Sequence, residues 1–222
     1  MFSVSVLDYQ RFPTGQASGW TLFWTHCLTG SHSAGPPRPA MTRVETPSDE
    51  ALMERYRSGD DQAFRELYYR HHAALHRYVS RLLPNRRSDS EDVFQETWIA
   101  VIRARQRYVG SARFTTYLYS IAHRKVADRW RHWYRTVAAP ELDPGVAGGT
   151  PESEAGNQYL GQALQQAVSQ LPAPQREAFL LKAEGGLSIE EIAKITGVSR
   201  ETAKSRLRYA LDKLRSALER WT

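Results

Sequence analysis

Apolar residues recur at helical spacing through most of the chain after residue 60. Between Asp60 and Leu83 they stand three or four residues apart, which places them on one face of an α-helix. The positions are Phe64, Leu67, Tyr68, Leu75, Tyr78, Val79 and Leu82. Pro84 follows and predicts the end of this helix. No stretch alternates apolar and polar residues for long enough to predict a sheet, so we expect an all-α chain.

Two more helices are predicted before residue 136. One begins near Ser88 or Ser90, because either hydroxyl can cap a helix whose first turn carries acids. Its expected buried stripe is Val93, Phe94, Trp98, Val101 and Ile102. The other spans about residues 114–134 and is expected to bury Leu118, Ile121, Ala122 and Val126.

The helical period resumes near residue 160 and continues to the C-terminal region. Its apolar positions are Leu160, Leu164, Val168 and Leu171, then Ala178, Phe179 and Leu181 after a break at two prolines. The stretch from Leu187 to Leu207 has the layout of a helix-turn-helix. Ser188 and Glu191 form a capping box, and Gly197 stands where a tight turn needs a positive φ.

The second helix of this motif has distinct inner and outer faces. Ser199 can cap it, and its inner face is Ala203, Leu207, Ala210, Leu211 and Leu214. The outward residues are Arg200, Glu201, Lys204, Ser205 and Arg208, which are types that reach phosphates and base edges. An ordinary helical hairpin with a solvated face is the alternative. The caps, the glycine and the polar face together favour a DNA-binding motif.

Charge is distributed unevenly along the 222 residues, which include 30 basic and 24 acidic side chains. Residues 51–135 carry seventeen basic and nine acidic side chains, and residues 158–222 carry ten and seven. This surplus indicates a polyanionic partner. Between the two blocks, residues 136–157 carry four acids and no Lys or Arg among Pro and Gly. We expect a flexible acidic linker that joins two small helical domains, residues 49–135 and 158–222; a long ordered loop is the alternative.

The N-terminal stretch, residues 1–48, differs from the remainder. Residues 12–37 carry no charge, but prolines and glycines interrupt them, and the apolar patch at residues 20–24 is too short to span a bilayer. We expect a disordered extension with no membrane insertion, or a translation start at Met41. The single cysteine, Cys27, excludes an internal disulfide and a cysteine-built zinc site, and it is compatible with the cytoplasm.

Basic and aromatic side chains are interleaved between residues 103 and 135. This segment has nine basic residues and one acid, with the aromatics Tyr108, Phe114, Tyr117, Tyr119, Trp130, Trp133 and Tyr134. Basic groups neutralise phosphates, and aromatic rings stack on unpaired bases at about 1–3 kcal/mol each. The segment therefore suits a locally melted strand. Burial in the core is the alternative, above all for Tyr117 and Trp130, whereas Tyr108, near Gly110, is expected to be exposed.

Four of the nine acids of the first block cluster at Asp89, Glu91, Asp92 and Glu96. Compensation of the helix dipole would explain only one or two, so the cluster indicates a docking surface for a basic protein. No histidine, cysteine or phosphate-binding loop adjoins it in sequence. His71, His72 and His76 lack a metal-ligand motif, and the first two are expected at the surface or at an edge. No enzyme activity and no cofactor are predicted.

Three motifs resemble bacterial RNA polymerase sigma factors of the extracytoplasmic-function (ECF) group. Residues 89–98, DSEDVFQETW, resemble their core-polymerase-binding motif. Residues 114–122, FTTYLYSIA, resemble their promoter-melting and minus-ten-reading segment, and residues 171–214 are similar to their minus-thirty-five-reading domain. The resemblance covers roughly residues 49–221. The family commonly has tryptophan where Tyr117 stands and often asparagine where Arg124 stands.

The resemblance implies three groups of site residues. Those that would bind the polymerase are Asp89, Glu91, Asp92, Gln95, Glu96 and Trp98. Those that would bind and melt the minus-ten element are Arg107, Tyr108, Arg113, Phe114, Tyr117, His123, Arg124, Lys125 and Arg129. Those that would read the minus-thirty-five element are Ser199, Arg200, Glu201, Thr202, Lys204, Ser205, Arg206 and Arg208.

The implied function is promoter recognition, DNA opening and transcription initiation as a subunit of RNA polymerase. The implied partners are the clamp and flap regions of core polymerase, promoter DNA and an anti-sigma factor, all met in the cytoplasm. The alternative is a stand-alone helix-turn-helix transcriptional regulator. A regulator of that kind would carry a ligand-binding or phosphoacceptor module in its first domain, and no pattern for either is found in this sequence.

Overall fold

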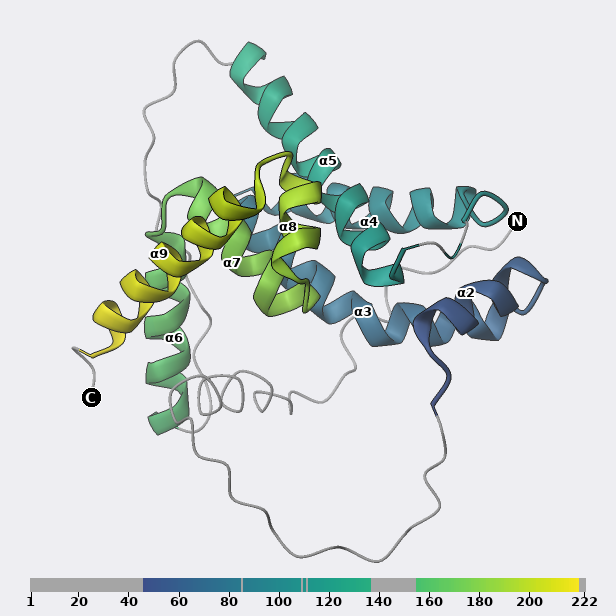
Figure 1. The fold of residues 1–222 in the computed structure, drawn as a ribbon, viewed down its shortest axis with the longest axis horizontal. Coiled ribbons are helices and arrows are strands. Elements are labelled where there is room, and N and C mark those ends of the chain that lie inside the picture. Colours follow the sequence, from purple (N-terminus) through teal and green to yellow (C-terminus); the bar gives the residue numbers. More distant parts are fainter. Residues whose placement is uncertain (1–45, 85, 109, 111, 137–154, 220–222) are drawn as a thin grey trace, which may run out of the picture. The chain divides into compact units, whose positions relative to one another are not determined.

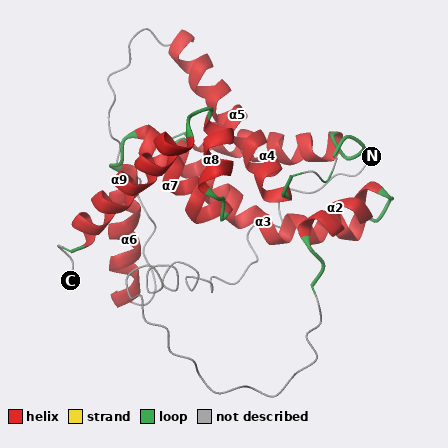
Figure 2. Ribbon diagram, in the orientation of Figure 1, coloured by secondary structure: helices red, strands yellow, loops and turns green. Residues whose placement is uncertain are grey.

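The computed structural model describes residues 46–219, except residues 85, 109, 111 and 137–154. Within these residues the chain forms eight α-helices and no strand (Figures 1 and 2). The all-α prediction is confirmed. The predicted N-terminal extension up to residue 45 and nearly all of the predicted linker lie outside the described residues. No helix in the described part of the chain is both long and apolar enough to cross a membrane.

The helices follow one another with short connections, apart from the stretch before α6. The first four are α2 (Asp49–Arg57), α3 (Asp61–Leu82), α4 (Arg87–Arg103) and α5 (Phe114–Thr136). The second four are α6 (Ala155–Ser169), α7 (Ala173–Gly185), α8 (Ile189–Thr196) and α9 (Arg200–Leu218). We call α2 to α5 the first half and α6 to α9 the second half.

Side-chain caps explain where α2 and α3 begin. Asp60 accepts hydrogen bonds from the backbone N–H of Gln62 at 2.9 Å and of Ala63 at 3.4 Å. Ser48 does the same for α2, where it accepts from the N–H of Ala51 at 3.2 Å. The predicted helix after Asp60 is confirmed. The short helix α2, which packs against α3 and buries Leu52 and Met53, was not predicted.

Neither serine predicted to cap α4 does so, and one residue of the predicted buried stripe of α4 is exposed. Arg86 precedes the helix and makes no side-chain capping bond. Ser90 is 4% exposed, and its hydroxyl donates to the carbonyl of Arg87 at 2.8 Å instead of capping the helix. Ile102 is 43% exposed, because the buried stripe ends at Val101.

The helix-turn-helix is confirmed in its local chemistry. Ser188 Oγ accepts from the N–H of Glu191 at 3.2 Å, and the Glu191 carboxylate accepts from the N–H of Ser188 at 2.7 Å. Gly197 has a φ of 68°, which glycine adopts at little steric cost. Ser199 then accepts from the N–H of Thr202 at 3.1 Å and begins α9.

Helix α7 joins the two halves. Its residues Ala178, Phe179, Leu180 and Leu181 are all at most 1% exposed. Consecutive residues of a helix point about 100° apart, so a run of four buried residues requires cover on several sides. Helices α8 and α9 provide part of it, and α3 and α5 of the first half provide the remainder (Figure 1). The described helices therefore form one compact unit. The sequence did not predict the contact between the two halves.

Candidate nucleic-acid and protein interfaces

Helix α4 presents the predicted acidic cluster, Asp89, Glu91, Asp92 and Glu96, opposite basic residues of α5. The guanidinium of Arg129 lies 3.6 Å from Asp89, 3.3 Å from Asp92 and 3.2 Å from Glu96. Lys125 Nζ lies 2.9 Å from Glu96. Two residues expected to contact the minus-ten element are therefore held against the acidic cluster in this structure.

The acidic cluster nevertheless remains reachable from solvent. The side chains of Asp92 and Glu96 are 52% and 46% exposed, and Gln95 beside them is exposed. Glu91 lies 3.2 Å from His76, at 35% exposure. Ion pairs at such exposure contribute about 0–1 kcal/mol, so a protein partner with closely matched basic groups can replace them.

Trp98, predicted both for the buried stripe of α4 and for contact with the polymerase, lies in the core. It is 5% exposed, with its ring 5.0 Å from that of Tyr68 and 5.9 Å from that of Phe64. The apolar groups that α4 does expose are Ile99 and Ile102, each 43% exposed. Both stand on the outward face with Gln95, and Ile99 lines a shallow hollow with Glu96 and Lys125. Ile99 and Ile102 follow Gln95 by four and seven residues, which is the spacing of one helix face. The sequence could therefore have predicted that both stand beside Gln95, but this prediction was missed.

Tyr108, predicted to be exposed, is 7% exposed. Its ring packs against Tyr117 at 5.3 Å and Phe114 at 6.4 Å, and its hydroxyl donates to the carbonyl of Ala112 at 3.0 Å. Burial, aided by the nearby carboxylates of Glu50 and Asp49, raises the pKa of Tyr108 to about 12. In this conformation Tyr108 supports the loop before α5 and cannot capture a flipped base.

A carboxylate from α2 anchors the beginning of α5. Glu50 Oε1 accepts a hydrogen bond from the backbone N–H of Phe114 at 2.9 Å, and the Phe114 ring is fully buried. Tyr117, one turn along, is only half-buried. Of the three aromatic residues predicted for the minus-ten element, Tyr117 alone therefore offers part of its surface to solvent.

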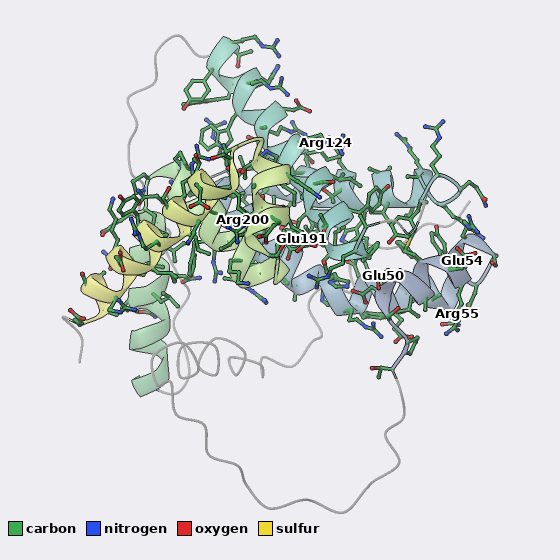
Figure 3. All side chains as sticks on the ribbon, viewed as in Figure 1. Glu50, Glu54, Arg55, Arg124, Glu191 and Arg200 are labelled. Atoms are coloured by element: carbon green, nitrogen blue, oxygen red, sulfur yellow. The ribbon has the colours of Figure 1, made fainter. Side chains whose placement is uncertain are left out.

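The remaining basic residues predicted for the minus-ten element divide into two sets. Arg113 and His123 face carboxylates of the second half, at 3.4 Å from Glu191 and 2.7 Å from Glu177. Arg107 and Arg124 are exposed, and Arg124 can be followed on α5 in Figure 3. In this arrangement, only two of the predicted basic contacts stand in solvent without a carboxylate partner among the described residues.

The outer face of α9 keeps most of its polar groups in solvent. Lys204 and Arg208 are exposed, and the Arg208 guanidinium lies 5.0 Å from the centre of the Tyr209 ring. Arg200, labelled in Figure 3, pairs with Glu190 at 2.5 Å and with Glu201 at 3.3 Å.

Other members of the group predicted for the minus-thirty-five element have structural roles in α9. The hydroxyls of Ser199 and Thr202 bond to each other at 2.8 Å, and Ser205 donates to the carbonyl of Thr202 at 3.0 Å. Arg206 is partly buried. The face thus offers Lys204, Arg208 and the end of Arg200 to a polyanion.

His71, expected at the surface or at an edge, is a mostly buried partner of α2. Its Nε2 lies 2.7 Å from Asp49 Oδ2, with 14% of the side chain exposed. Burial alone would raise the pKa of Asp49, but the bonds from His71 and Arg70 outweigh it and lower the pKa. Among the described residues, no group of three or more His, Cys, Asp or Glu is arranged to hold a metal ion.

Comparison with known proteins finds two family models and several relatives that match this chain. The model of sigma-70 region 2 matches residues 67–136, and that of sigma-70 region 4 matches residues 161–214. RNA polymerase sigma factor CarQ of Myxococcus xanthus is 32% identical over 166 residues, which cover 75% of this chain and 95% of CarQ. The ECF RNA polymerase sigma-E factor of Escherichia coli K12 is 34% identical over 179 residues, or 74% and 93% of the two chains.

Solved structures agree with these relatives. CnrH, in complex with the cytosolic domain of CnrY, is 25% identical with a TM-score of 0.55, over 79% of this chain and all of CnrH. The sigma factor RpoE of Bartonella quintana, solved with the anti-sigma factor NepR, shares the fold at 22% identity and a TM-score of 0.54, over 70% and 96% of the chains. The two family models lie in the same order as the motifs, and the relatives match over nearly their whole length. The chain therefore belongs to the sigma-70 family of RNA polymerase sigma factors, in its extracytoplasmic-function group.

Proposed function

We propose that this sigma factor binds core RNA polymerase through the exposed face of α4, opens the promoter along α5 and reads the upstream element through α9. The assignment rests on one observation: α4 and α9 expose side chains of different charge and polarity. Acids and exposed isoleucines gather on α4, whereas exposed cations gather on α9. An acidic, partly apolar face suits a basic protein surface, and a basic helix face suits the DNA backbone.

The domain assignment follows the same division. Residues 49–135 form the unit that binds polymerase and the minus-ten element, residues 136–157 the linker and residues 158–222 the unit that reads the minus-thirty-five element. The two family models, which match residues 67–136 and 161–214, support this division. The factor acts on promoter DNA in the cytoplasm, as an initiation subunit and not as an enzyme.

A protein inhibitor is the further partner that we propose. Two structural relatives were solved with a bound protein: CnrH with the cytosolic domain of CnrY, and RpoE with an anti-sigma factor. A partner of this type would cover the polymerase-binding face of α4, the DNA-binding surfaces, or both.

The α4 assignment predicts that reversing two acids abolishes polymerase binding. The variant carries Asp92→Arg and Glu96→Arg, both at half-exposed side chains, so helicity by circular dichroism should be retained. Like charges would then face the basic partner surface. The measurement is co-elution of the purified chain with core RNA polymerase on size exclusion, without DNA.

The matched control reverses two exposed acids elsewhere, Glu54→Arg and Asp212→Arg, with side chains 57% and 56% exposed. It makes the same change in net charge and should leave co-elution intact. Co-elution of the α4 variant at the original stoichiometry would remove the docking assignment. Loss of binding in the control as well would mean that overall charge, not the α4 face, governs association. If the unmodified chain fails to bind polymerase, the stand-alone regulator becomes the better explanation.

A further inference from the structure

Helix α2 contacts both ends of the segment that leads from α4 to α5. We call residues 104–113 the α4–α5 connection; it carries Arg107, Tyr108 and Arg113, which the proposed function assigns to the minus-ten element. Its beginning lies against the C-terminal end of α2, and the residue that follows it lies against the N-terminal end of α2. A helix that the sequence did not predict therefore holds the connection at two points.

Arg105 and Gln106 make the contact at the beginning of the connection. The Arg105 guanidinium lies 4.6 Å from the centre of the Tyr56 ring and 4.0 Å from Asp61. Gln106 Nε2 donates to the backbone carbonyl of Arg57 at 3.4 Å. A cation over an aromatic face contributes about 0.5–1 kcal/mol at such sites, so this end is held by several weak contacts and no single strong one.

Glu50 makes the contact at the end of the connection. Its Oε1 accepts from the backbone N–H of Phe114, the first residue of α5, at 2.9 Å. The first N–H groups of a helix have no acceptor within the helix, and a carboxylate there also complements the helix dipole. The buried Phe114 ring lies 5.4 Å from the His71 ring, and His71 Nε2 lies 2.7 Å from Asp49. Two successive carboxylates of α2 thus fix the backbone and the ring of Phe114.

The position of Phe114 determines how the neighbouring aromatic residues lie. Tyr117 stands one turn further along α5, and its half-buried ring is 5.3 Å from that of Tyr108 in the connection. A surface that selects a base must be held in one geometry, because ordering it during binding costs affinity and discrimination. Helix α2 therefore sets the geometry of a surface to which its own residues do not belong.

We propose that Glu50 is a positioning residue for base selection at the minus-ten element. The proposal rests on the function proposed for α5 and goes beyond it, because Glu50 acts through Phe114 and not through contact with DNA. Loss of the hydrogen bond lets the connection and the first turn of α5 adopt several arrangements, which lowers base selection. Total DNA binding changes less, because exposed cations such as Arg107 and Arg124 bind phosphates independently of sequence.

The first test measures hydrogen exchange of the Phe114 amide by NMR in the full chain, without polymerase or DNA. Glu50→Ala should speed the exchange about fivefold, because loss of a helix cap costs about 1 kcal/mol. Glu50→Gln keeps an oxygen acceptor at the same place and should restore the protection. The matched control is Glu54→Ala, one turn along α2, where the exposed side chain pairs with Arg57 (Figure 3). It should leave the exchange unchanged, and equal exchange in Glu50→Ala and the unmodified chain would overturn the inference.

The second test measures base selection by the complex of the chain with core RNA polymerase. The probe is a pool of single-stranded DNA, about 20 nucleotides long with about eight random central positions, and the bound fraction is sequenced. We expect the unmodified chain to enrich particular bases. Glu50→Ala should lower that enrichment about fivefold at equal total binding, in line with the lost cap. Glu50→Gln and Glu54→Ala should enrich as the unmodified chain does.

The outcomes separate this inference from the function on which it rests. No enrichment by the unmodified complex would remove both. Enrichment that is the same in Glu50→Ala, or that falls only as much as total binding falls, would remove the role of Glu50 alone. Gln106→Ala provides a second variant, since it removes the bond to Arg57 at an exposed side chain and should lower enrichment in the same direction. Circular dichroism and co-elution with polymerase should be the same for every chain.

Discussion

Tyr108 is held on three sides, by the rings of Phe114 and Tyr117 and by the carbonyl of Ala112. At the scale of the single residue, such surroundings decide its chemistry. The same residue type in an open loop would stack on a base, whereas here it supports the loop that leads into α5. Trp98 shows the same effect on α4, because its ring fills the core between Tyr68 and Phe64.

The raised pKa of Tyr108 predicts a measurable loss of stability at alkaline pH. The folded chain keeps this proton up to about pH 12, whereas the unfolded chain loses it near pH 10. The free energy of unfolding therefore falls as pH rises between these values. Tyr108→Phe removes the group and should reduce that slope, by up to about 1.4 kcal/mol per pH unit. Urea unfolding at pH 9 and pH 11 measures it; equal slopes would show that Tyr108 is not shielded.

At the scale of the element, α4 has two faces with separate tasks. Val93, Phe94, Trp98 and Val101 are buried in the core, while Asp92, Gln95, Ile99 and Ile102 face solvent. Exposed isoleucines next to carboxylates are typical of an interface whose centre is apolar and whose rim is charged. The exposed face of α4 therefore combines carboxylates with apolar side chains.

Ile99→Ala should weaken polymerase binding while leaving the fold intact. Removal of an apolar side chain at an interface costs about 1 kcal/mol, which lowers the affinity about fivefold. Val101→Ala, two residues away but fully buried, should instead lower the free energy of unfolding by about 2 kcal/mol. Titration of core polymerase by fluorescence anisotropy, together with urea unfolding, separates the two effects. Equal affinity of Ile99→Ala and the unmodified chain would limit the docking face to its charged residues.

At the scale of the whole molecule, α7 decides how the two halves meet. It packs against α3 and α5 with apolar residues and carries Glu177 and Glu184, which pair with His123 and Arg77 of the first half. Glu191, on α8, closes the capping box of the helix-turn-helix and also bonds to Thr116 of the first half. The local structure of the DNA-reading motif and the contact between the halves therefore share one carboxylate.

The pKa of Glu191 predicts a contribution to stability that depends on its charge. Burial by itself raises this pKa, but hydrogen bonds from Thr116 and Ser188 and the charge of Arg113 lower it below its ordinary value. The contribution is therefore present above about pH 4.5 and is lost as pH falls through the lowered pKa. Glu191→Gln keeps the capping geometry and should cost about 1–2 kcal/mol at pH 7, but less at pH 3. Urea unfolding at both values measures this; an equal cost at the two pH values would exclude a charge effect.

Local chemistry allowed much of the fold to be predicted from the sequence. Ser188 and Ser199 cap helices where their positions predicted, and Gly197 adopts the positive φ that the turn requires. These features depend on residues within a few positions of each other, so a single sequence carries the information. The cap of α4 was misjudged because Ser90 bonds to Arg87 within the helix instead of capping its start.

The sequence by itself determined the all-α class, the helix-turn-helix, the acidic cluster and the membership of the sigma family. Only the tertiary structure decided which side chains remain available to partners. Tyr108 became a core residue, Arg129 and Lys125 paired with the acidic cluster, and Glu184 entered a buried contact with α3. The physical reason is range: caps and periodicity act over one or two turns, whereas burial and ion pairing depend on helices brought together from up to 107 residues apart.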